Sequence, residues 1–246
     1  MKLYQHFLDG IPDYLARHYW WAYLWPRSVW FFDHQPIINA ILFGQYQKLM
    51  SATIGRLKQA PLDRTLQLTC VYGSLTPNLI KHLNTPLHIT DAATVQLELA
   101  QSKAMGNSEL LATRMNAEHL GYRSDVFTTT VLFFLLHEMP AEARRNTLSE
   151  TMRTLAPGGT LLITEYGPLP THHWLYRFTP FRWLLTTLEP FLNSFWHDNL
   201  FALLNEMAAL HGKVVEQSWE KRIFSGFYRI TEFNIVLTQE REFIPD

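Results

Sequence analysis

The sequence predicts an α/β fold with one mainly parallel, seven-stranded sheet and helices on both faces. After Pro61, short apolar stretches alternate with segments of helical periodicity, the pattern of parallel strands joined by crossover helices. The stretch from Val126 to Leu136 ends as a continuous apolar run, which is typical of a parallel strand buried on both faces. Residues 213–219 and 227–239, the second of which alternates in hydrophobicity, predict an antiparallel pair that closes the sheet.

The N-terminal part predicts a helical arm over residues 1–60. Pro12 and Pro26 interrupt its first half, and residues 36–57 place apolar side chains at the spacing of one helix face. The first nine residues contain no apolar segment of the signal-peptide type, so we expect no secretory signal.

Five strands and their helices follow in order. Thr76 is suited to cap the first of these helices, with Pro77 at its first position. The last helix, over residues 140–155, is ended by the run Pro157-Gly158-Gly159. The predicted strands are 65–71, 86–90 with Asp91 at its end, 110–115, 126–136 and 160–165. The rhythm then breaks, and residues 166–212 predict a helical, aromatic cap inserted into a single domain that spans residues 1–246.

Composition narrows the class of function. Charged residues make up 17% of the chain and the net charge is −1, so the basic footprint of a nucleic-acid partner is absent. A single cysteine, Cys70, excludes an internal disulfide or a multi-thiolate zinc site. No apolar run has the length of a membrane-spanning helix, so we expect a cytoplasmic protein.

Aromatic residues reach 14% and gather in two clusters. Trp and Tyr favour surfaces where one end is apolar and the other wet, although an ordinary aromatic core is equally compatible with such clusters. The first cluster contains Trp20, Trp21, Trp25 and Trp30 near Arg17 and Arg27, which together resemble an interfacial membrane anchor. The second, within residues 174–201, could form the apolar mouth of a pocket.

In an open α/β sheet the ligand lies beyond the carboxyl ends of the strands, beside the first one. That rule brings Tyr72, Gly73, Ser74 and Asp91 to one crevice. An acidic side chain at the end of the second strand accepts hydrogen bonds from ribose hydroxyls, which favours a nucleoside cofactor over a simple helix cap.

The order of these motifs resembles the class I S-adenosylmethionine-dependent methyltransferases, above all quinone methyltransferases of the UbiE type. The resemblance covers residues 35–240 and rests on the runs 66–73, 89–91, 115–120, 125–127 and 155–159. One departure stands out. Gln67 occupies the acidic position of the family's first motif, and Thr69 and Val71 stand where glycines belong, so only Gly73 remains. Val71 and Tyr72 should therefore crowd the place of the cofactor's methionine half.

The runs 14–23, 32–46 and 70–76 resemble a narrower family with this altered loop, the rhodoquinone-biosynthesis family RquA. This resemblance implies conversion of ubiquinone to rhodoquinone, in which an amino group replaces a ring methoxy group. S-adenosylmethionine would supply the nitrogen, and manganese would be required. The quinone lies in a bilayer, so the resemblance also implies peripheral contact with the inner face of that membrane.

The resemblance assigns roles to individual residues. Tyr72 and His137 are expected to be catalytic, and Glu165 with His172 and His173 to bind manganese, which prefers oxygen ligands and accepts imidazole. His137 with Glu138, and more weakly His197 with Asp198, are alternative ligands. For each histidine taken alone a structural role is favoured, whereas for the group near the strand ends a metal site is about as favoured as a structural role. The expected cofactor-binding residues are Tyr46, Tyr72, Gly73, Asp91, Ala92, Asn116 and Ala117.

Two other functions stay open on the sequence. One is conventional methyl transfer to a quinone or phenol, and the other is an inactive cofactor-fold scaffold of a quinone-biosynthesis complex. Away from the crevice, Arg144 and Arg145 are expected on a solvated helix face.

Overall fold

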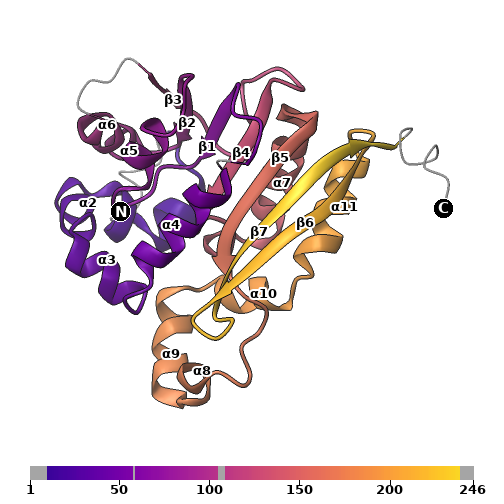
Figure 1. The fold of residues 1–246 in the computed structure, drawn as a ribbon. Coiled ribbons are helices and arrows are strands. Elements are labelled where there is room, and N and C mark those ends of the chain that lie inside the picture. The colour runs from indigo at the N-terminus through magenta and orange to yellow at the C-terminus, as the bar shows by residue number, and fades with distance from the viewer. Residues whose placement is uncertain (1–9, 58, 105–108, 239–246) are drawn as a thin grey trace.

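The computed structural model describes residues 10–57, 59–104 and 109–238, and the expectation about the first nine residues lies outside these ranges. A seven-stranded sheet forms the centre, in the order β3-β2-β1-β4-β5-β7-β6 (Figure 1). The first five strands are parallel, and β7 pairs antiparallel with both β5 and β6. The predicted fold class is therefore confirmed. The strands are β1 (Thr65–Leu68), β2 (Leu87–Asp91), β3 (Leu110–Arg114), β4 (Phe127–Phe133), β5 (Leu155–Tyr166), β6 (Lys213–Ile223) and β7 (Tyr228–Leu237).

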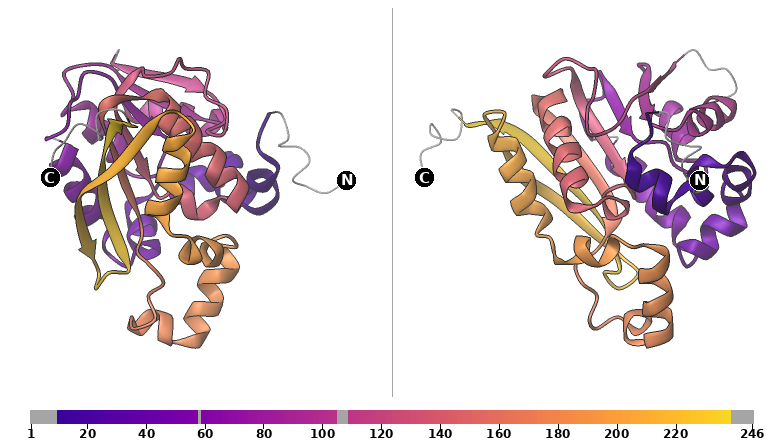
Figure 2. Two further views of the ribbon diagram at one scale, coloured as in Figure 1. Left: turned by 90° about the vertical axis from the view of Figure 1, so that its right-hand side faces the viewer. Right: turned by 180° about the vertical axis from the view of Figure 1, so that it is seen from behind.

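Helices cover both faces of this sheet. Helix α4 (Tyr46–Leu57) lies on one face, and α7 (Ala141–Thr154) and α11 (Leu200–Ala209) lie together on the other (Figures 1 and 2). The central strands are buried on both sides, as their apolar runs predict. The other helices outside the N-terminal arm are α5 (Leu75–Ile80), α6 (Thr94–Lys103), the 3₁₀ turn η3 (Leu136–Glu138), α8 (Trp174–Arg177), α9 (Thr179–Leu188) and α10 (Leu192–His197).

The arm consists of short helical pieces that lie across the carboxyl ends of the strands. They are α1 (Asp13–His18), a π-helical turn (Trp20–Leu24), α2 (Pro26–Phe32) and α3 (Gln35–Ile41). None of the helices within the described ranges has the length and apolar character needed to cross a bilayer.

The single helix predicted over residues 36–57 is wrong, because the chain forms two helices, α3 and α4. Phe43 and Gly44 between them have φ of 50° and 71°, a left-handed conformation that cannot continue a right-handed helix. Helix α5 also begins earlier than expected. Ser74 is its N-cap residue, and the Thr76 hydroxyl donates a hydrogen bond to Gln67 instead of capping the helix.

The loop after β1 is held by the arm at Gly73. The Gly73 N–H donates to Asp33 Oδ1 over 2.7 Å, and Lys103 Nζ donates to both Asp33 Oδ1 and the Gly73 carbonyl. The Tyr46 hydroxyl accepts hydrogen bonds from the N–H groups of Ser74 and Leu75, which have no acceptor within the helix because they lie at the start of α5. The one glycine retained in the altered motif therefore serves a close contact between loop and arm.

This contact predicts that Gly73→Ala is more destabilising than an ordinary left-handed glycine replacement. A Cβ at Gly73 would lie 2.4 Å from the Tyr46 hydroxyl, and φ is +84°. We expect the free energy of unfolding to fall by about 3 kcal/mol or more, because backbone strain and overpacking add. Gly212, with φ +67° and nothing within 4 Å, is the matched control, and Gly212→Ala should cost only about 1–2 kcal/mol. Equal losses in urea unfolding would contradict the close contact.

Candidate functional site

A cavity of about 200 Å³ lies at the carboxyl ends of β1, β2 and β4. The arm closes it from outside, and its walls are mainly aromatic and aliphatic. Seven of the residues expected at the site line this cavity, at the edge of the sheet where the topological rule puts a ligand. They are Tyr46, Tyr72, Asp91, Ala92, Asn116, Ala117 and His137.

Asp91 ends β2 and is buried, with 8% of its surface exposed. Its Oδ2 accepts the Cys70 N–H over 3.2 Å, and its Oδ1 accepts the Ala93 N–H over 2.8 Å. Burial raises the pKa of Asp91 to about 7, although these backbone hydrogen bonds act in the opposite direction. The carboxyl group also lines the cavity, at the end of the second strand.

The altered loop has a defined internal arrangement. The Gln67 side chain donates to the Thr69 carbonyl and accepts from Thr76, so it supports the loop from beneath. The Tyr72 hydroxyl donates to the Ala22 carbonyl of the arm, and its ring stacks on Tyr23 at 5.6 Å. Burial raises the pKa of Tyr72 above its usual range, so this phenol stays protonated. Tyr72 forms part of the cavity wall, and no contact of its hydroxyl indicates a role as a base.

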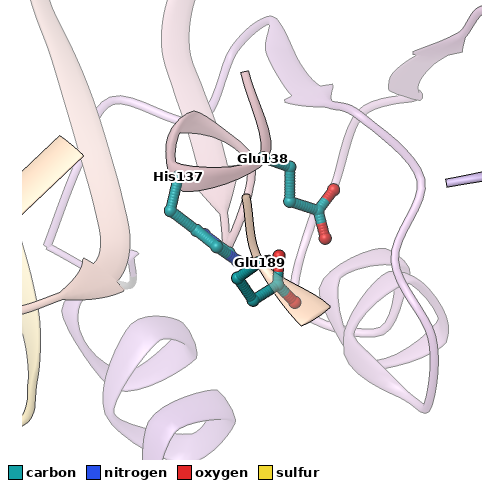
Figure 3. A group of neighbouring side chains, drawn as sticks. All are labelled: His137, Glu138 and Glu189. Carbon is teal, nitrogen blue, oxygen red and sulfur yellow. Dashed lines mark ion pairs between the residues drawn. The ribbon is translucent and has the colours of Figure 1, made fainter. Parts of the chain in front are cut away.

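Three ligand-type side chains meet inside the cavity. His137 and Glu138 belong to η3, directly after β4, and Glu189 follows α9. Their nearest nitrogen and carboxylate atoms all lie within 4.8 Å of one another, and His137 Nε2 lies 3.8 Å from Glu189 Oε2 (Figure 3). Figure 3 shows the imidazole directed at the Glu189 carboxylate, with Glu138 beside it. Within the part of the chain that the structure describes, this is the only such group of three.

The three groups share an unusual electrostatic environment. Burial alone would lower the pKa of His137, but the carboxylates of Glu165, Glu189 and Glu138 outweigh it and raise the pKa to about 9. Burial and mutual repulsion raise the pKa values of Glu138 and Glu189 above the usual range of a carboxyl. The site therefore holds protons that a cation could displace.

Two tyrosines of the arm bind these carboxylates. The Tyr19 hydroxyl donates to Glu189 Oε2 over 3.0 Å, and the Tyr23 hydroxyl donates to Glu138 Oε1. Burial next to the carboxylates raises the pKa of both phenols, so they act as donors. The arm thus completes the polar part of the cavity.

Glu165 lies behind His137. Its Oε1 lies 2.7 Å from His137 Nδ1, and its Oε2 accepts the Leu136 N–H over 3.0 Å. A carboxylate on one imidazole nitrogen, with the other nitrogen free for a ligand, is the usual outer support of a metal-binding histidine. Glu165 is therefore placed as the partner of His137.

The metal set predicted from Glu165, His172 and His173 is not brought together. His172 is exposed. His173 accepts the Leu175 N–H at Nδ1 and packs its ring between Phe224 and Phe227, at 4.7 and 4.9 Å. His173 is the N-cap residue of α8 and packs the inserted segment against the turn before β7. It is therefore committed to a structural contact and does not line the cavity. The weaker pair fails as well, since Asp198 pairs with Arg144 and the exposed His197 is bound to the Asn193 carbonyl.

Arg144 is fully buried, so its predicted place on a solvated face is wrong. Its guanidinium donates to the Leu136 and Met139 carbonyls, which flank His137 and Glu138, and it pairs with Asp198. Arg144 therefore fixes the turn that carries two of the three ligand-type groups. Arg145 is exposed and pairs with Glu206.

The sequence analysis missed Glu189, Tyr19 and Tyr23 as site residues. A signal for Glu189 was present, because it is the only acidic residue between Tyr166 and Asp198. A lone carboxylate in a long aromatic segment costs free energy when buried and implies a specific partner. The two tyrosines carried no such signal within an aromatic-rich arm.

Comparisons with known proteins bear on this fold. Residues 65–159 match a family model described as a methyltransferase domain. The [4+2]-cyclase SpnF superposes with a TM-score of 0.58 at 15% identity, over 86% of this chain and 97% of that one. This chain has the class I methyltransferase fold. PH0226 protein from Pyrococcus horikoshii OT3 gives 0.57 at 14% identity, over 92% of this chain and 99% of that one.

A third similar structure is the N-methyltransferase NodS from Bradyrhizobium japonicum WM9 in complex with S-adenosyl-L-homocysteine. It superposes with a TM-score of 0.54 at 14% identity, over 83% of this chain and 90% of that one. No curated protein matches the sequence. These comparisons describe the fold, and the methyltransferase-domain match includes Asp91, His137 and Glu138 but neither the arm nor the cap.

The residues present fit two kinds of bound group. Asp91, an acidic side chain at the end of β2, fits a ribose diol, and it lines the cavity together with Asn116 and Ala117. One imidazole and two carboxylates that hold excess negative charge fit a hard divalent cation such as manganese.

We expect Glu189→Gln to lower the affinity for Mn²⁺ at least tenfold, because an amide oxygen carries no charge to balance the ion. The measurement is calorimetric titration of the purified chain with Mn²⁺. Glu206→Gln is the matched control, since Glu206 is an exposed partner of Arg145 on α11 and lies outside the cavity. Equal affinity in both variants would remove Glu189 from the metal site.

Binding of Mn²⁺ should strengthen as the pH rises from 6 to 8. The pKa of His137 is about 9 and that of Glu138 is raised, so both hold protons that must leave before metal binds. Each displaced proton makes the apparent dissociation constant fall about tenfold per pH unit below the pKa. Titrations at three pH values test this. A pH-independent constant would show that the ion does not displace these protons.

Proposed function

We propose that this protein aminates a membrane quinone: it converts ubiquinone to rhodoquinone, with S-adenosylmethionine as the amino donor and manganese as the required ion. The observation that carries the proposal is the buried group of His137, Glu138 and Glu189 in the same cavity as Asp91. It gives a methyltransferase fold a charged, ligand-type centre at the place where an acceptor substrate would meet the cofactor.

The nucleoside half of the donor has a place in this cavity. Asp91 would accept the ribose hydroxyls, and Asn116 with Ala117 would bound the adenine. The similar NodS structure is a complex with S-adenosyl-L-homocysteine, which supports a related ligand here. The methionine half has a different environment, because Gln67 replaces the acidic residue and is committed to Thr69 and Thr76. The donor's amine would therefore lack a carboxylate at position 67 to hold it as an ammonium.

The aromatic wall suits a planar acceptor ring. Tyr23, Tyr72 and Phe32 form a stacked series, with ring centroids 5.6 and 6.2 Å apart. A quinone ring is electron-poor, so flat contact with these electron-rich faces is favourable. The wall ends beside Glu138, to which Tyr23 is hydrogen-bonded, and this contact brings ring binding and the charged group into one site.

The reaction is an addition followed by an elimination. The free amine of the donor attacks the ring carbon that bears the methoxy group, a carbon–nitrogen bond forms, and the electron pair moves onto the quinone oxygen. The carbon–oxygen bond to the methoxy group then breaks, and the amine proton leaves with methoxide as methanol. This exchange leaves the donor attached to the ring through its nitrogen. The bond between that nitrogen and the donor's α-carbon would then break as a proton leaves the adjacent β-carbon, which gives the ring amino group and an unsaturated acid. Neither step needs an oxidant or a reductant.

The chain's own groups would assist in two ways. His137, Glu138 and Glu189 would hold the manganese ion, whose Lewis acidity would polarise the quinone oxygen. Glu165 orients the imidazole, and Tyr19 and Tyr23 fix the two carboxylates by donating to them. The arm over the cavity would keep bulk water away from the electron-poor ring. Water would otherwise compete with the amine as a nucleophile.

A second candidate is conventional methyl transfer to a quinone or phenol, which the methyltransferase-domain match favours. The fold alone does not decide, since the similar SpnF is a [4+2]-cyclase. The altered loop disfavours methyl transfer, because Val71 and Tyr72 line the space that glycines would leave open. With a bilayer quinone as substrate under either reaction, we propose that the protein acts as a peripheral protein at the cytoplasmic face of the bilayer.

Mass spectrometry of the quinone product distinguishes these functions. Purified protein is incubated with ubiquinone, manganese and S-adenosylmethionine labelled with ¹⁵N at the α-amine. We expect a lighter, ¹⁵N-labelled product, and a loss of at least tenfold in its rate with Glu189→Gln but not with Glu206→Gln. A heavier, unlabelled, methylated product would establish the second candidate. Cofactor binding without any product would favour the scaffold.

A further inference from the structure

Helix α9 exposes apolar side chains on the face that points away from the rest of the protein. None of its residues is buried, and the half-covered ones are Phe181, Arg182, Leu185 and Thr186. The opposite, exposed stripe carries Trp183 at 68% exposure with Leu184 and Leu188, both at 47%. A helix on a soluble surface turns its polar stripe outward. This one turns an apolar stripe outward, which marks an interaction surface.

Helix α8 and the segment after it extend the same surface. Trp174 and Phe178 are 65% and 59% exposed. Figures 1 and 2 show α8 and α9 projecting together beyond the end of the sheet, with no other labelled element over them. We define the cap face as Trp174, Phe178, Trp183, Leu184 and Leu188.

Within the segment that carries the cap face, the charged side chains have one sign. Between Gly167 and Leu188 the only charged side chains are Arg177 and Arg182, and no acidic residue occurs. Arg182 also lies over the Tyr176 ring at 5.2 Å, which holds it at the base of the helix. Exposed tryptophans with flanking arginines and without carboxylates match an anionic lipid surface, where the rings enter the headgroup region and the guanidiniums meet phosphates.

Helix α9, which carries most of the cap face, ends at Leu188, and the next residue, Glu189, lines the cavity. Ile41 lines the cavity and is itself 47% exposed, so it marks the place where the cavity approaches the surface. Phe43, two residues later, contacts Phe181 of α9 with a centroid distance of 5.3 Å. Trp30 and Phe31 of α2, at 66% and 48% exposure, add apolar surface on the arm's side.

We propose that the cap face docks on an anionic lipid bilayer, and that this contact brings the cavity mouth at Ile41 to the membrane surface. The proposal rests on the proposed function only in that it gives a bilayer quinone its route to the cavity. It also reassigns the two aromatic clusters. Of the predicted anchor, Trp20 and Trp21 are half-buried in the arm whereas Trp25 and Trp30 are exposed, and in this proposal the second cluster supplies the main docking helix.

Vesicle flotation of the full chain tests the proposal. The probe is liposomes of phosphatidylcholine with 30 mol% phosphatidylglycerol, flotation being read as the fraction of protein bound. We expect the wild type to float, Trp174→Ser/Trp183→Ser to bind at least tenfold more weakly, and Arg177→Gln/Arg182→Gln to lose about fivefold per arginine on anionic vesicles only. Leu111→Ser/Leu210→Ser is the matched control, because both leucines are exposed on β3 and after α11, away from the cap.

Two further readouts separate this proposal from the proposed reaction. Brominated lipids should quench the wild-type tryptophan fluorescence and quench Trp174→Ser/Trp183→Ser much less, with unchanged thermal unfolding showing an intact fold. Activity of that variant should fall with vesicle-borne quinone and persist with a short-tailed, water-soluble quinone. A wild type that stays unbound, or a cap variant that floats as well as the control, overturns the docking proposal. Flotation without amination supports docking and removes the reaction alone.

Discussion

The site depends on burying more negative charge than the chain itself neutralises. Glu138, Glu165 and Glu189 surround one imidazole, that of His137, in a largely apolar cavity. An unpaired buried carboxylate costs several kcal/mol, so such a group must hold protons or bind a cation. The raised pKa of Glu138 and that of His137, about 9, express this constraint in the metal-free chain. The Tyr19 and Tyr23 hydroxyls stabilise the carboxylates by donating hydrogen bonds to them. Arg144 fixes the turn that carries His137 and Glu138 by donating to its carbonyls.

The same constraint explains why the arm is part of the cavity. Tyr19 and Tyr23 bind the carboxylates, Tyr46 takes the free N–H groups at the start of α5, and Asp33 holds the loop at Gly73. A loop rich in glycine leaves its backbone open to a cofactor. In this chain, side chains of the arm and of α4 contact the loop instead. Opening the arm would expose the cavity and remove two donors from the charged group at once. Access to the site and its electrostatics are therefore coupled.

Sequence reasoning reached the fold and the edge of the sheet that carries the site, because strand alternation and the position of Asp91 are local patterns. It failed where a residue's role depends on a distant partner. Arg144 lies on a largely polar helix, but its four hydrogen-bond partners come from the turn at η3 and from α10 with the residue after it. They are the Leu136 and Met139 carbonyls, Ser194 and Asp198. His172 and His173 follow β5 closely in sequence, but the chain leaves the cavity there, and Glu189 returns to it only after α9. Helix periodicity also could not show the break at Gly44, where a left-handed turn separates α3 from α4.

The polar side chains of the site come from three different segments of the chain. The segment that matches the methyltransferase domain supplies the sheet, Asp91, His137 and Glu138. Glu189 comes from the cap, and Tyr19 and Tyr23 come from the arm, so the charged group is complete only when parts outside that segment close over it. A shared fold at 14–15% identity fixes the location of the cavity but leaves its polar groups free to differ. In this chain those groups bring three ligand-type side chains and an aromatic wall together in the cavity. The chemistry is therefore set by the arm and the cap, and the cap that contributes Glu189 to the site also carries the surface we assign to the membrane.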